Sequence, residues 1–200
     1  MNLSNTVVKY LILVAFVCFA FTCTAQQKAP FKAEKLGLKS DFTKIEYKGI
    51  RYFVFKCDPK KYKIELLNVL PNKTLCTMAK IRDLKKDKLV FAMNGGMFMD
   101  NGIALGLFVH AGKQTRFPVR DTTGYGNFYV QPNGVFMMAD GGAARVLTTV
   151  EFMFQQSGVM EATQSGPMLV HNGMCNRKFV DTSPNINIRN AVGVDRKGIV

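Results

Sequence analysis

Three short polar clusters interrupt a chain that is otherwise rich in apolar residues. They are Asn94-Gly95-Gly96-Met97-Phe98, Gln164-Ser165-Gly166-Pro167 and Ile188-Arg189-Asn190. Each follows an apolar run, where a loop at the end of a strand can present side chains and backbone amides to a ligand. CxxC pairs, the HExxH zinc motif, phosphate-binding Walker loops and the GxSxG elbow do not occur in the sequence. We therefore expect the chemistry of the chain to come from these three clusters.

The first cluster combines an amide side chain with two glycines. Asn94 can donate and accept hydrogen bonds, and Gly95 and Gly96 allow close backbone approach and positive φ. Asp100 follows within the same loop. We interpret the cluster as a loop that holds a ligand, with an ordinary turn at a strand end as the alternative.

The third cluster carries a guanidinium group between two amide side chains. Arg189 follows Asn187 and precedes Asn190. The planar fork of an arginine donates two parallel hydrogen bonds to a pair of anionic oxygens. Arg189 therefore indicates a phosphate or carboxylate in the ligand, with a surface salt bridge as the alternative.

The second cluster is expected to supply oriented hydrogen-bond donors rather than a nucleophile. No histidine stands in a known local pattern that would activate Ser165. His110 and His171 lie at predicted strand ends, and we expect both to be surface or strand-edge residues rather than bases. A glycosidase usually uses two carboxylates, and the sequence does not give their separation. The acids nearest the clusters are Asp100, Asp121, Asp140, Glu161 and Asp181.

The net charge of the chain is strongly positive. Its 200 residues carry 27 Lys and Arg against 14 Asp and Glu, a formal net charge of +13. The densest basic stretch, residues 80–88, lacks the interleaved aromatic residues of a single-strand-binding platform. We expect a solvated basic face and no nucleic-acid partner. Such a face would raise the local concentration of a phosphate-bearing substrate.

The first 25 residues are predicted to be a signal peptide. Lys9 precedes the apolar run at residues 10–21, and small residues follow at the position that a signal peptidase reads, with cleavage before Gln26. The mature protein is then exported to the periplasm or beyond, with no stable membrane span, because spanning needs about 20 apolar residues. A lipid anchor on Cys23 is the alternative.

Three cysteines remain after cleavage, at positions 57, 76 and 175. A Cys57–Cys76 disulfide suits an oxidising compartment, and buried free thiols are the alternative. A metal site is not predicted without CxxC or clustered histidines, no cofactor is predicted, and the sequence leaves a metal requirement open.

The patterning predicts a single α+β domain over residues 41–200, with a mainly antiparallel β core and flanking helices. Residues 26–40 are expected to be a mobile arm. Because residues 199–200 read as the start of a strand, we expect the domain to be incomplete at its C-terminus. Helices are predicted at 75–86 and 148–161, the latter from a capping box at Thr148 and Glu151. Strands are predicted at 44–47, 51–57, 62–70, 88–93, 105–110, 127–130, 135–138, 168–170 and 191–194, with 44–57 and 127–138 as hairpins.

The order of these segments resembles the phosphodiester glycosidase family, which includes the lysosomal uncovering enzyme (an N-acetylglucosamine-1-phosphodiester α-N-acetylglucosaminidase) and many secreted bacterial homologues. The resemblance runs from about residue 91 to residue 200. The segments that carry it are FAMNGGMF with GLFVHAGK, GYGNFYVQPNGVF with ATQSGPMLVHNG, and INIRNAVGVDRKG. The family's later Leu-Asp-Gly-Gly segment has no counterpart before Val200.

The resemblance implies hydrolysis of a sugar-1-phosphodiester at the glycosidic carbon, which yields a free sugar and a phosphomonoester. Because a phosphate monoester is already a good leaving group, a strong general acid is less needed than for an ordinary glycoside. Asn94 and its glycines would line the sugar pocket, with Ser165, Gly166 and Arg189 near the phosphate. No nucleophile is assigned. The predicted catalytic residues are Asn94, Asp100 and Arg189, and the predicted substrate-binding residues are Gly95, Gly96, Gln164, Ser165, Gly166 and Asn187.

Two other functions compete with this enzyme. One is a non-catalytic envelope module that binds anionic glycans through its basic face, which predicts binding that weakens steeply with salt. The other, weaker alternative is nucleic-acid binding, which conflicts with an export signal.

Overall fold

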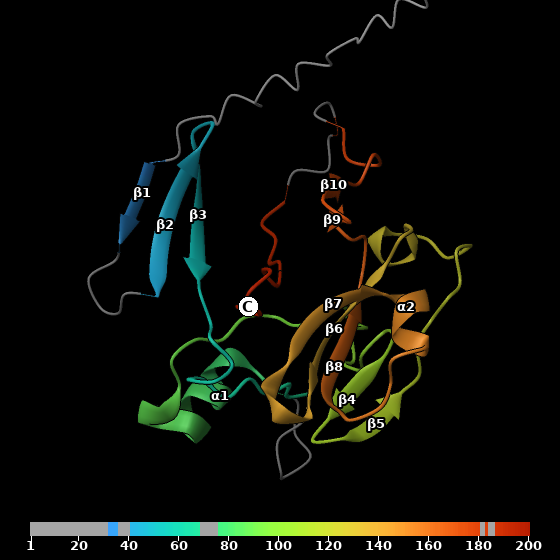
Figure 1. Cartoon of the computed structure of the whole chain (residues 1–200), viewed down its shortest axis with the longest axis horizontal. Coiled ribbons are helices and arrows are strands. Elements are labelled where there is room, and N and C mark those ends of the chain that lie inside the picture. The colour runs from blue at the N-terminus through green and yellow to red at the C-terminus, as the bar shows by residue number, and fades with distance from the viewer. Residues whose placement is uncertain (1–31, 36–40, 69–75, 181–182, 184–186) are drawn as a thin grey trace, which may run out of the picture.

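The structure, a computed structural model, describes residues 32–35, 41–68, 76–180, 183 and 187–200 (Figure 1). Its strands are β1 Lys32–Lys35, β2 Phe42–Tyr47, β3 Ile50–Phe55, β4 Phe108–His110, β5 Lys113–Arg116, β6 Gly134–Ala139, β7 Ala144–Thr148, β8 Val159–Ser165, β9 Val170–His171 and β10 Met174–Cys175. The α-helices are α1 Met78–Lys85 and α2 Thr149–Met153, and the 3₁₀ helices are η1 Lys86–Lys88, η2 Asn127–Tyr129 and η3 Asp140–Gly142. No helix within these ranges is long and apolar enough to cross a membrane.

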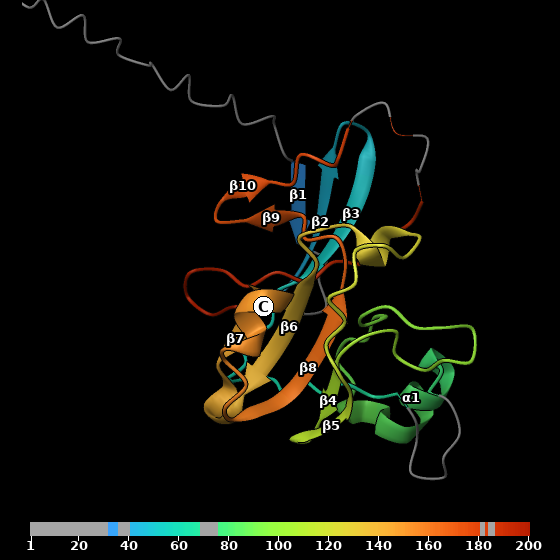
Figure 2. The same cartoon turned by 90° about the vertical axis from the view of Figure 1, so that its right-hand side faces the viewer.

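An antiparallel five-stranded sheet forms the centre of the molecule, with strand order β5-β4-β8-β6-β7. A three-stranded antiparallel sheet, β1-β2-β3, lies apart from it, and β9 and β10 form a short hairpin (Figures 1 and 2). In both views the coil at 187–200 lies between the two larger sheets. The prediction of a mainly antiparallel α+β fold is confirmed.

One face of the central sheet forms the main apolar core. Because side chains alternate along a strand, Ala162 and Gln164 of β8 face the same side as Val135 and Met137 of β6. Phe152 of α2 packs into this cluster and is 1% exposed. The buried members of the cluster are Leu107, Val109, Val135, Met137, Phe152 and Ala162.

The opposite face of the sheet carries Glu161, Thr163 and Ser165 of β8. Phe136 and Met138 of β6 stand opposite Thr163 and Glu161 and are buried. Two segments without strand or helix, residues 62–68 and 94–97, contact this face. Both therefore belong to the folded body, and the second of them contains the Asn-Gly-Gly cluster.

The predicted hairpin at 44–57 is confirmed as β2 and β3, with the turn at Lys48 and Gly49. Both turn residues have positive φ, 49° and 76°, which suits the tight turn between twisted strands. An aromatic cluster joins the base of this hairpin to the body: the Phe55 ring lies 5.1 Å from that of Phe91 and 5.4 Å from that of Tyr62. The Tyr62 hydroxyl also donates a 2.7 Å hydrogen bond to Asp41.

The helix predicted at 148–161 begins as expected and ends early. Thr148 accepts from the Glu151 amide at 3.1 Å, and the Glu151 carboxylate accepts from the Thr148 amide at 2.7 Å, so the capping box is confirmed. The helix ends at Met153, and a turn with Gly158 at φ 67° leads into β8. Glu161 is therefore a strand residue, because the alternating residues that follow Gly158 pair with β4 and β6 on both sides.

Several predicted strands are absent. Residues 62–68, 88–93 and 191–194 form no strand, and 69–70 lie outside the described residues. Residues 127–129 form η2 instead of the first strand of the predicted 127–138 hairpin, while its second strand is β6. Apolar character alone does not distinguish a strand from a coil. These segments are held by side-chain packing and turns rather than by backbone hydrogen bonds to a neighbouring strand. The helix at 75–86 and the Asn172-Gly173 hairpin turn are found as α1 and as β9–β10.

The N-terminal and cysteine predictions have mixed outcomes. The predicted signal peptide lies outside the described residues, and of the predicted arm, residues 32–35 form β1, paired with β2. The cysteines at 57, 76 and 175 are all free, so the Cys57–Cys76 disulfide is wrong. The alternative of buried free thiols is correct for Cys57 alone, because Cys76 is partly exposed and Cys175 is exposed. Burial raises the pKa of the Cys57 thiol. The backbone of Cys57 exchanges two hydrogen bonds with Val200, at 2.7 and 2.9 Å.

Candidate functional site

The Asn94-Gly95-Gly96 turn lies on the Thr163 face of β8. Gly96 has φ 62°, and a Cβ atom there would overlap the Thr163 hydroxyl and lie 3.1 Å from the Gln164 carbonyl oxygen. The Met97 amide donates to that same carbonyl at 3.4 Å. Position 96 therefore requires glycine for both its conformation and its space. This contact brings the first two clusters of the sequence together.

A small loop follows this turn and carries Asp100. Phe98 and Ala104 form an isolated antiparallel bridge, and the Leu105 amide donates to the Met97 carbonyl at 2.8 Å. Asp100 lies at the exposed tip between them, and Asn94 is exposed as well. Both predicted catalytic side chains of this loop are thus accessible to a ligand.

Gln164 is an internal cross-link. Its side chain is 1% exposed, and its Oε1 accepts from the amides of Leu107 at 3.1 Å and Val119 at 2.9 Å. Its Nε2 donates to the Val119 carbonyl at 2.7 Å and to the Thr149 hydroxyl at 3.0 Å. Those bonds occupy the amide inside the protein. The contribution of Gln164 to a site on the Thr163 face is therefore its backbone carbonyl, which holds Met97.

Ser165 and Gly166 end β8 beside η2. Ser165 stands opposite Gly134 of β6 and is partly exposed. A Cβ at Gly166 would lie 2.7 Å from the Phe128 carbonyl oxygen and 2.9 Å from that of Asn127, so only glycine fits. The tight packing fixes the Ser-Gly backbone against the segment at 127–128.

An open depression of about 710 Å³ adjoins this packing, and Asn127 contributes to both. One cationic side chain, Lys178, is among its lining residues. The lining consists of Thr122, Gly124, Tyr125, Gly126, Asn127, Tyr129, Val130, Gln131 and Lys178.

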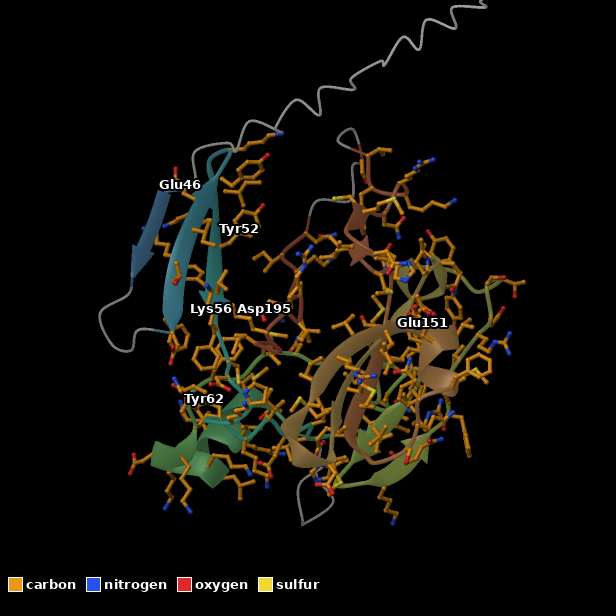
Figure 3. All side chains as sticks on the ribbon, in the orientation of Figure 1. Glu46, Tyr52, Lys56, Tyr62, Glu151 and Asp195 are labelled. Atoms are coloured by element: carbon orange, nitrogen blue, oxygen red, sulfur yellow. The ribbon has the colours of Figure 1, made fainter. Side chains whose placement is uncertain are left out.

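The third cluster lies in the exposed coil at 187–194. Arg189 and Asn187 are both exposed, and the Arg189 Nη1 donates to the Ile188 carbonyl at 3.4 Å. Further along this segment, Asp195 lies close to Lys56, as labelled in Figure 3. The pKa of Asp195 is lowered first by the hydrogen bond from the Ile199 amide, with a further contribution from the charge of Lys56. The segment that carries Arg189 is thus anchored beside the end of β3.

Sequence reasoning missed a paired histidine and carboxylate. Glu161 is 6% exposed, and the His110 Nδ1 lies 3.1 and 3.2 Å from its two oxygens. His110 was expected to be a surface or strand-edge residue, and it is the last residue of β4 with a side chain that is 40% exposed. The alternation of residues 159–165 is the one signal that could have placed Glu161 on a strand.

A buried polar network under β8 completes the geometry. The Thr149 hydroxyl donates to Asn133 Oδ1 at 2.7 Å, and the Asn133 Nδ2 donates to the Phe128 carbonyl at 3.4 Å. Together with Gln164 these bonds tie α2, β6 and η2 to the strand end that carries Ser165.

Among the described residues, no group of three or more His, Cys, Asp or Glu side chains is arranged to hold a metal ion.

The fold and these loops define a class of protein, an antiparallel α+β domain. Its candidate site is built from loops that lie on the Thr163 face of β8 and at the Ser165 end of that strand. A family model described as phosphodiester glycosidase matches residues 87–200, more than half of the chain. The chain belongs to the phosphodiester glycosidase family.

A curated relative also matches about half of the chain. The chain is 35% identical over 107 residues to the uncharacterized protein YigE of Escherichia coli (strain K12). The match covers 54% of this chain and 41% of YigE, so the chain spans less than half of that relative's length. No solved structure matches the chain.

Proposed function

We propose that this protein hydrolyses the glycosidic bond of a sugar-1-phosphodiester and releases a free sugar and a phosphomonoester. One observation carries the proposal. The Asn94-Gly95-Gly96 turn is seated on β8 next to Gln164-Ser165-Gly166, and both clusters lie within the 87–200 region that matches the phosphodiester glycosidases.

The proposed reaction breaks the bond between the anomeric carbon and the phosphate oxygen. A water oxygen becomes bonded to the anomeric carbon, the phosphomonoester leaves with the electron pair of the broken bond, and the proton released by the water passes to solvent or phosphate. Asn94 and the backbone of the turn hold the sugar. Asp100, at the accessible loop tip, orients the water.

Stabilisation of the departing phosphate is the main catalytic task in this proposal. Negative charge develops on the leaving phosphate oxygen as the bond breaks. Hydrogen-bond donors that are fixed in place and point at that oxygen stabilise the transition state most effectively. The Arg189 guanidinium, Asn187 and the backbone of Ser165 and Gly166 supply those donors. This assignment requires the coil at 187–190 to face the strand end, and it makes Arg189 more important for turnover than for folding.

A direct assay tests this proposal. The full-length protein is incubated with a sugar-1-phosphodiester, and free sugar is measured for wild type, Arg189→Ala and Arg196→Ala. Arg196 is an exposed arginine of the same coil and outside the proposed site, so it is the matched control. We expect loss of about 100-fold or more in turnover for Arg189→Ala, comparable to removal of one oxyanion donor, and little change for Arg196→Ala. Equal activity of the two variants would contradict the role of Arg189.

The charge of the protein favours one alternative, a module that binds anionic glycans without hydrolysing them. The formal net charge is +13, and the basic residues of α1 and η1 are largely exposed. This alternative requires binding that weakens steeply with salt, no sugar release, and an affinity that Asn94→Ala leaves unchanged. Export through the predicted signal peptide is part of both proposals and is tested by N-terminal sequencing of the secreted protein.

A further inference from the structure

Glu161 is the buried carboxylate among the acidic residues that the structure describes. Its Oε2 accepts from the Leu66 amide at 3.1 Å, and its Oε1 accepts from the Ala111 amide at 3.1 Å. The His110 Nδ1 completes the arrangement at 3.1 and 3.2 Å. One carboxylate on the central strand therefore holds two backbone segments that lie 45 residues apart in the sequence, at Leu66 and Ala111.

The Leu66 segment in turn supports the Asn94-Gly95-Gly96 turn. The Leu66 Cδ2 lies 3.6 Å from the position of a Cβ on Gly95, which is ordinary van der Waals contact. Gly96 sits over Thr163, which is two residues from Glu161 on the same face of β8. The turn thus rests on the strand at one point and on Leu66 at another.

We propose that Glu161 is a positioning residue for the Asn94-Gly95-Gly96 turn, and that it acts by fixing the Leu66 segment against the sheet. As a statement about sugar binding, this inference rests on the proposed function. As a statement about the order of the turn, it stands on these contacts alone.

A carboxylate suits this position because two of its partners, the Leu66 and Ala111 amides, are donors, and the His110 Nδ1 is a third donor in the form that carries its proton on that nitrogen. Two oxygens with several acceptor sites can serve two backbone amides and the His110 Nδ1–H together. A glutamine offers one acceptor oxygen and turns its NH₂ group towards a donor, which leaves at least one buried amide without a partner. Glu161→Gln therefore breaks the link to Leu66 or the link to Ala111 while it preserves side-chain size.

The neighbouring charges offer a matched control. Lys63 and Lys85 both bind the Glu65 carboxylate, and they lower the pKa of Glu65. Glu161 lies close enough for its charge to contribute to the raised pKa of Lys63, after the larger contribution of Glu65. Glu65 shares the 62–68 segment with Leu66 and binds the two lysine side chains, so Glu65→Gln changes the charge of the segment and leaves its link to β8 intact.

The experiment measures amide hydrogen exchange in wild type, Glu161→Gln, Leu66→Ala and Glu65→Gln. We expect the Met97 amide to exchange about tenfold faster in Glu161→Gln, the equivalent of one lost buried hydrogen bond to a charged group. Leu66→Ala is expected to give the same local acceleration, and Glu65→Gln is expected to give none. Where Glu161→Gln fails to fold, Leu66→Ala still tests the contact through which Glu161 would act on the turn, and unchanged exchange at Met97 in that variant would overturn the inference.

Kinetics on the sugar-1-phosphodiester form the second part of the experiment. A misplaced sugar-holding turn raises KM about tenfold and leaves kcat within about twofold, whereas a merely structural loss lowers the amount of active protein and leaves KM unchanged. Acceleration at Met97 that Glu65→Gln reproduces, or exchange that changes only at residues 64–68, would overturn the inference. Absence of turnover in the wild type would refute the proposed function alone, because the exchange measurement still decides the role of Glu161.

Discussion

Substitution of Gly96 by alanine is the sharpest test of the geometry that joins the first two clusters. Gly96 adopts φ 62°, and alanine in the left-handed region costs about 1 to 2 kcal/mol. The added Cβ also overlaps the Thr163 hydroxyl, and overpacking of a buried site costs about 1 to 3 kcal/mol. Gly96→Ala is therefore expected to lower the free energy of unfolding by about 2 to 5 kcal/mol, with the two contributions summed.

Gly95→Ala is the matched control for this substitution. Gly95 is not among the glycines with positive φ, and its nearest neighbour would be the Leu66 Cδ2 at 3.6 Å, an ordinary contact. Urea denaturation monitored by circular dichroism gives both free energies of unfolding. We expect Gly95→Ala to change stability by less than about 1 kcal/mol, because the exposed position needs no rearrangement.

Removal of the Thr163 hydroxyl separates the two costs. In the double variant Gly96→Ala, Thr163→Ala the overlap is relieved and the backbone cost remains, so the two substitutions should couple by about 1 to 3 kcal/mol. Equal stability of Gly95→Ala and Gly96→Ala, or simple additivity of the Gly96 and Thr163 changes, would show that the turn does not rest on Thr163.

Two further predictions follow from polar contacts and a third from the burial of a cysteine. Gln164→Ala leaves buried amide groups without partners and should cost about 3 to 5 kcal/mol in urea denaturation, with an effect near zero contradicting its role as a cross-link. The pKa of Glu151 is lowered, chiefly by the hydrogen bond from the Thr148 amide, so its contribution to stability is complete above its unfolded pKa and is lost as pH falls through the lower folded pKa. Stability measured from pH 6 to pH 3 should therefore fall less steeply in Glu151→Gln, and unchanged steepness would refute the assignment. In the native protein a thiol reagent should modify the exposed Cys175 quickly and Cys57 slowly, because Cys57 is 6% exposed and its pKa is raised by burial, and equal rates would contradict that burial.

Local signals in the sequence predicted those parts of the fold that depend on neighbouring residues. The Lys48-Gly49 turn indicated the β2–β3 hairpin, and Thr148 with Glu151 indicated the start of α2 (Figure 3 labels Glu151 on that helix). These signals fix where an element begins. They do not fix its length, which is why the helix predicted to reach Glu161 ends at Met153.

The sheet partners and the buried polar contacts could not be predicted, because they join residues that are distant in the chain. Gln164 resembles a loop residue in a Gln-Ser-Gly-Pro motif, and its burial depends on Leu107 and Val119, which lie 57 and 45 residues away. The same holds for His110 and Glu161, which are 51 residues apart. A side chain's role in such a site follows from tertiary packing rather than from its neighbours in sequence.

The candidate site was predictable to the extent that glycines mark it. Gly96 and Gly166 each stand where another residue would collide with the backbone or side chain of a distant segment. Those collisions explain why glycine occupies these two positions. The sequence placed both clusters at strand ends, which is confirmed for Gln164-Ser165-Gly166 at the end of β8 and wrong for Asn94-Gly95-Gly96, because residues 89–93 form no strand. The structure adds that the first cluster lies over the second.

We propose that the Asn94 turn, the Ser165-Gly166 strand end and Arg189 form one site that hydrolyses a sugar-1-phosphodiester. The most direct measurement is the release of free sugar by the full-length protein in wild type, Asn94→Ala and Arg189→Ala forms, with Arg196→Ala as the control. We predict sugar release by wild type and control and a loss of about 100-fold or more in turnover for Arg189→Ala, with weaker substrate binding for Asn94→Ala. Folded wild-type protein that binds such an ester without releasing sugar would contradict the claim and favour the glycan-binding alternative.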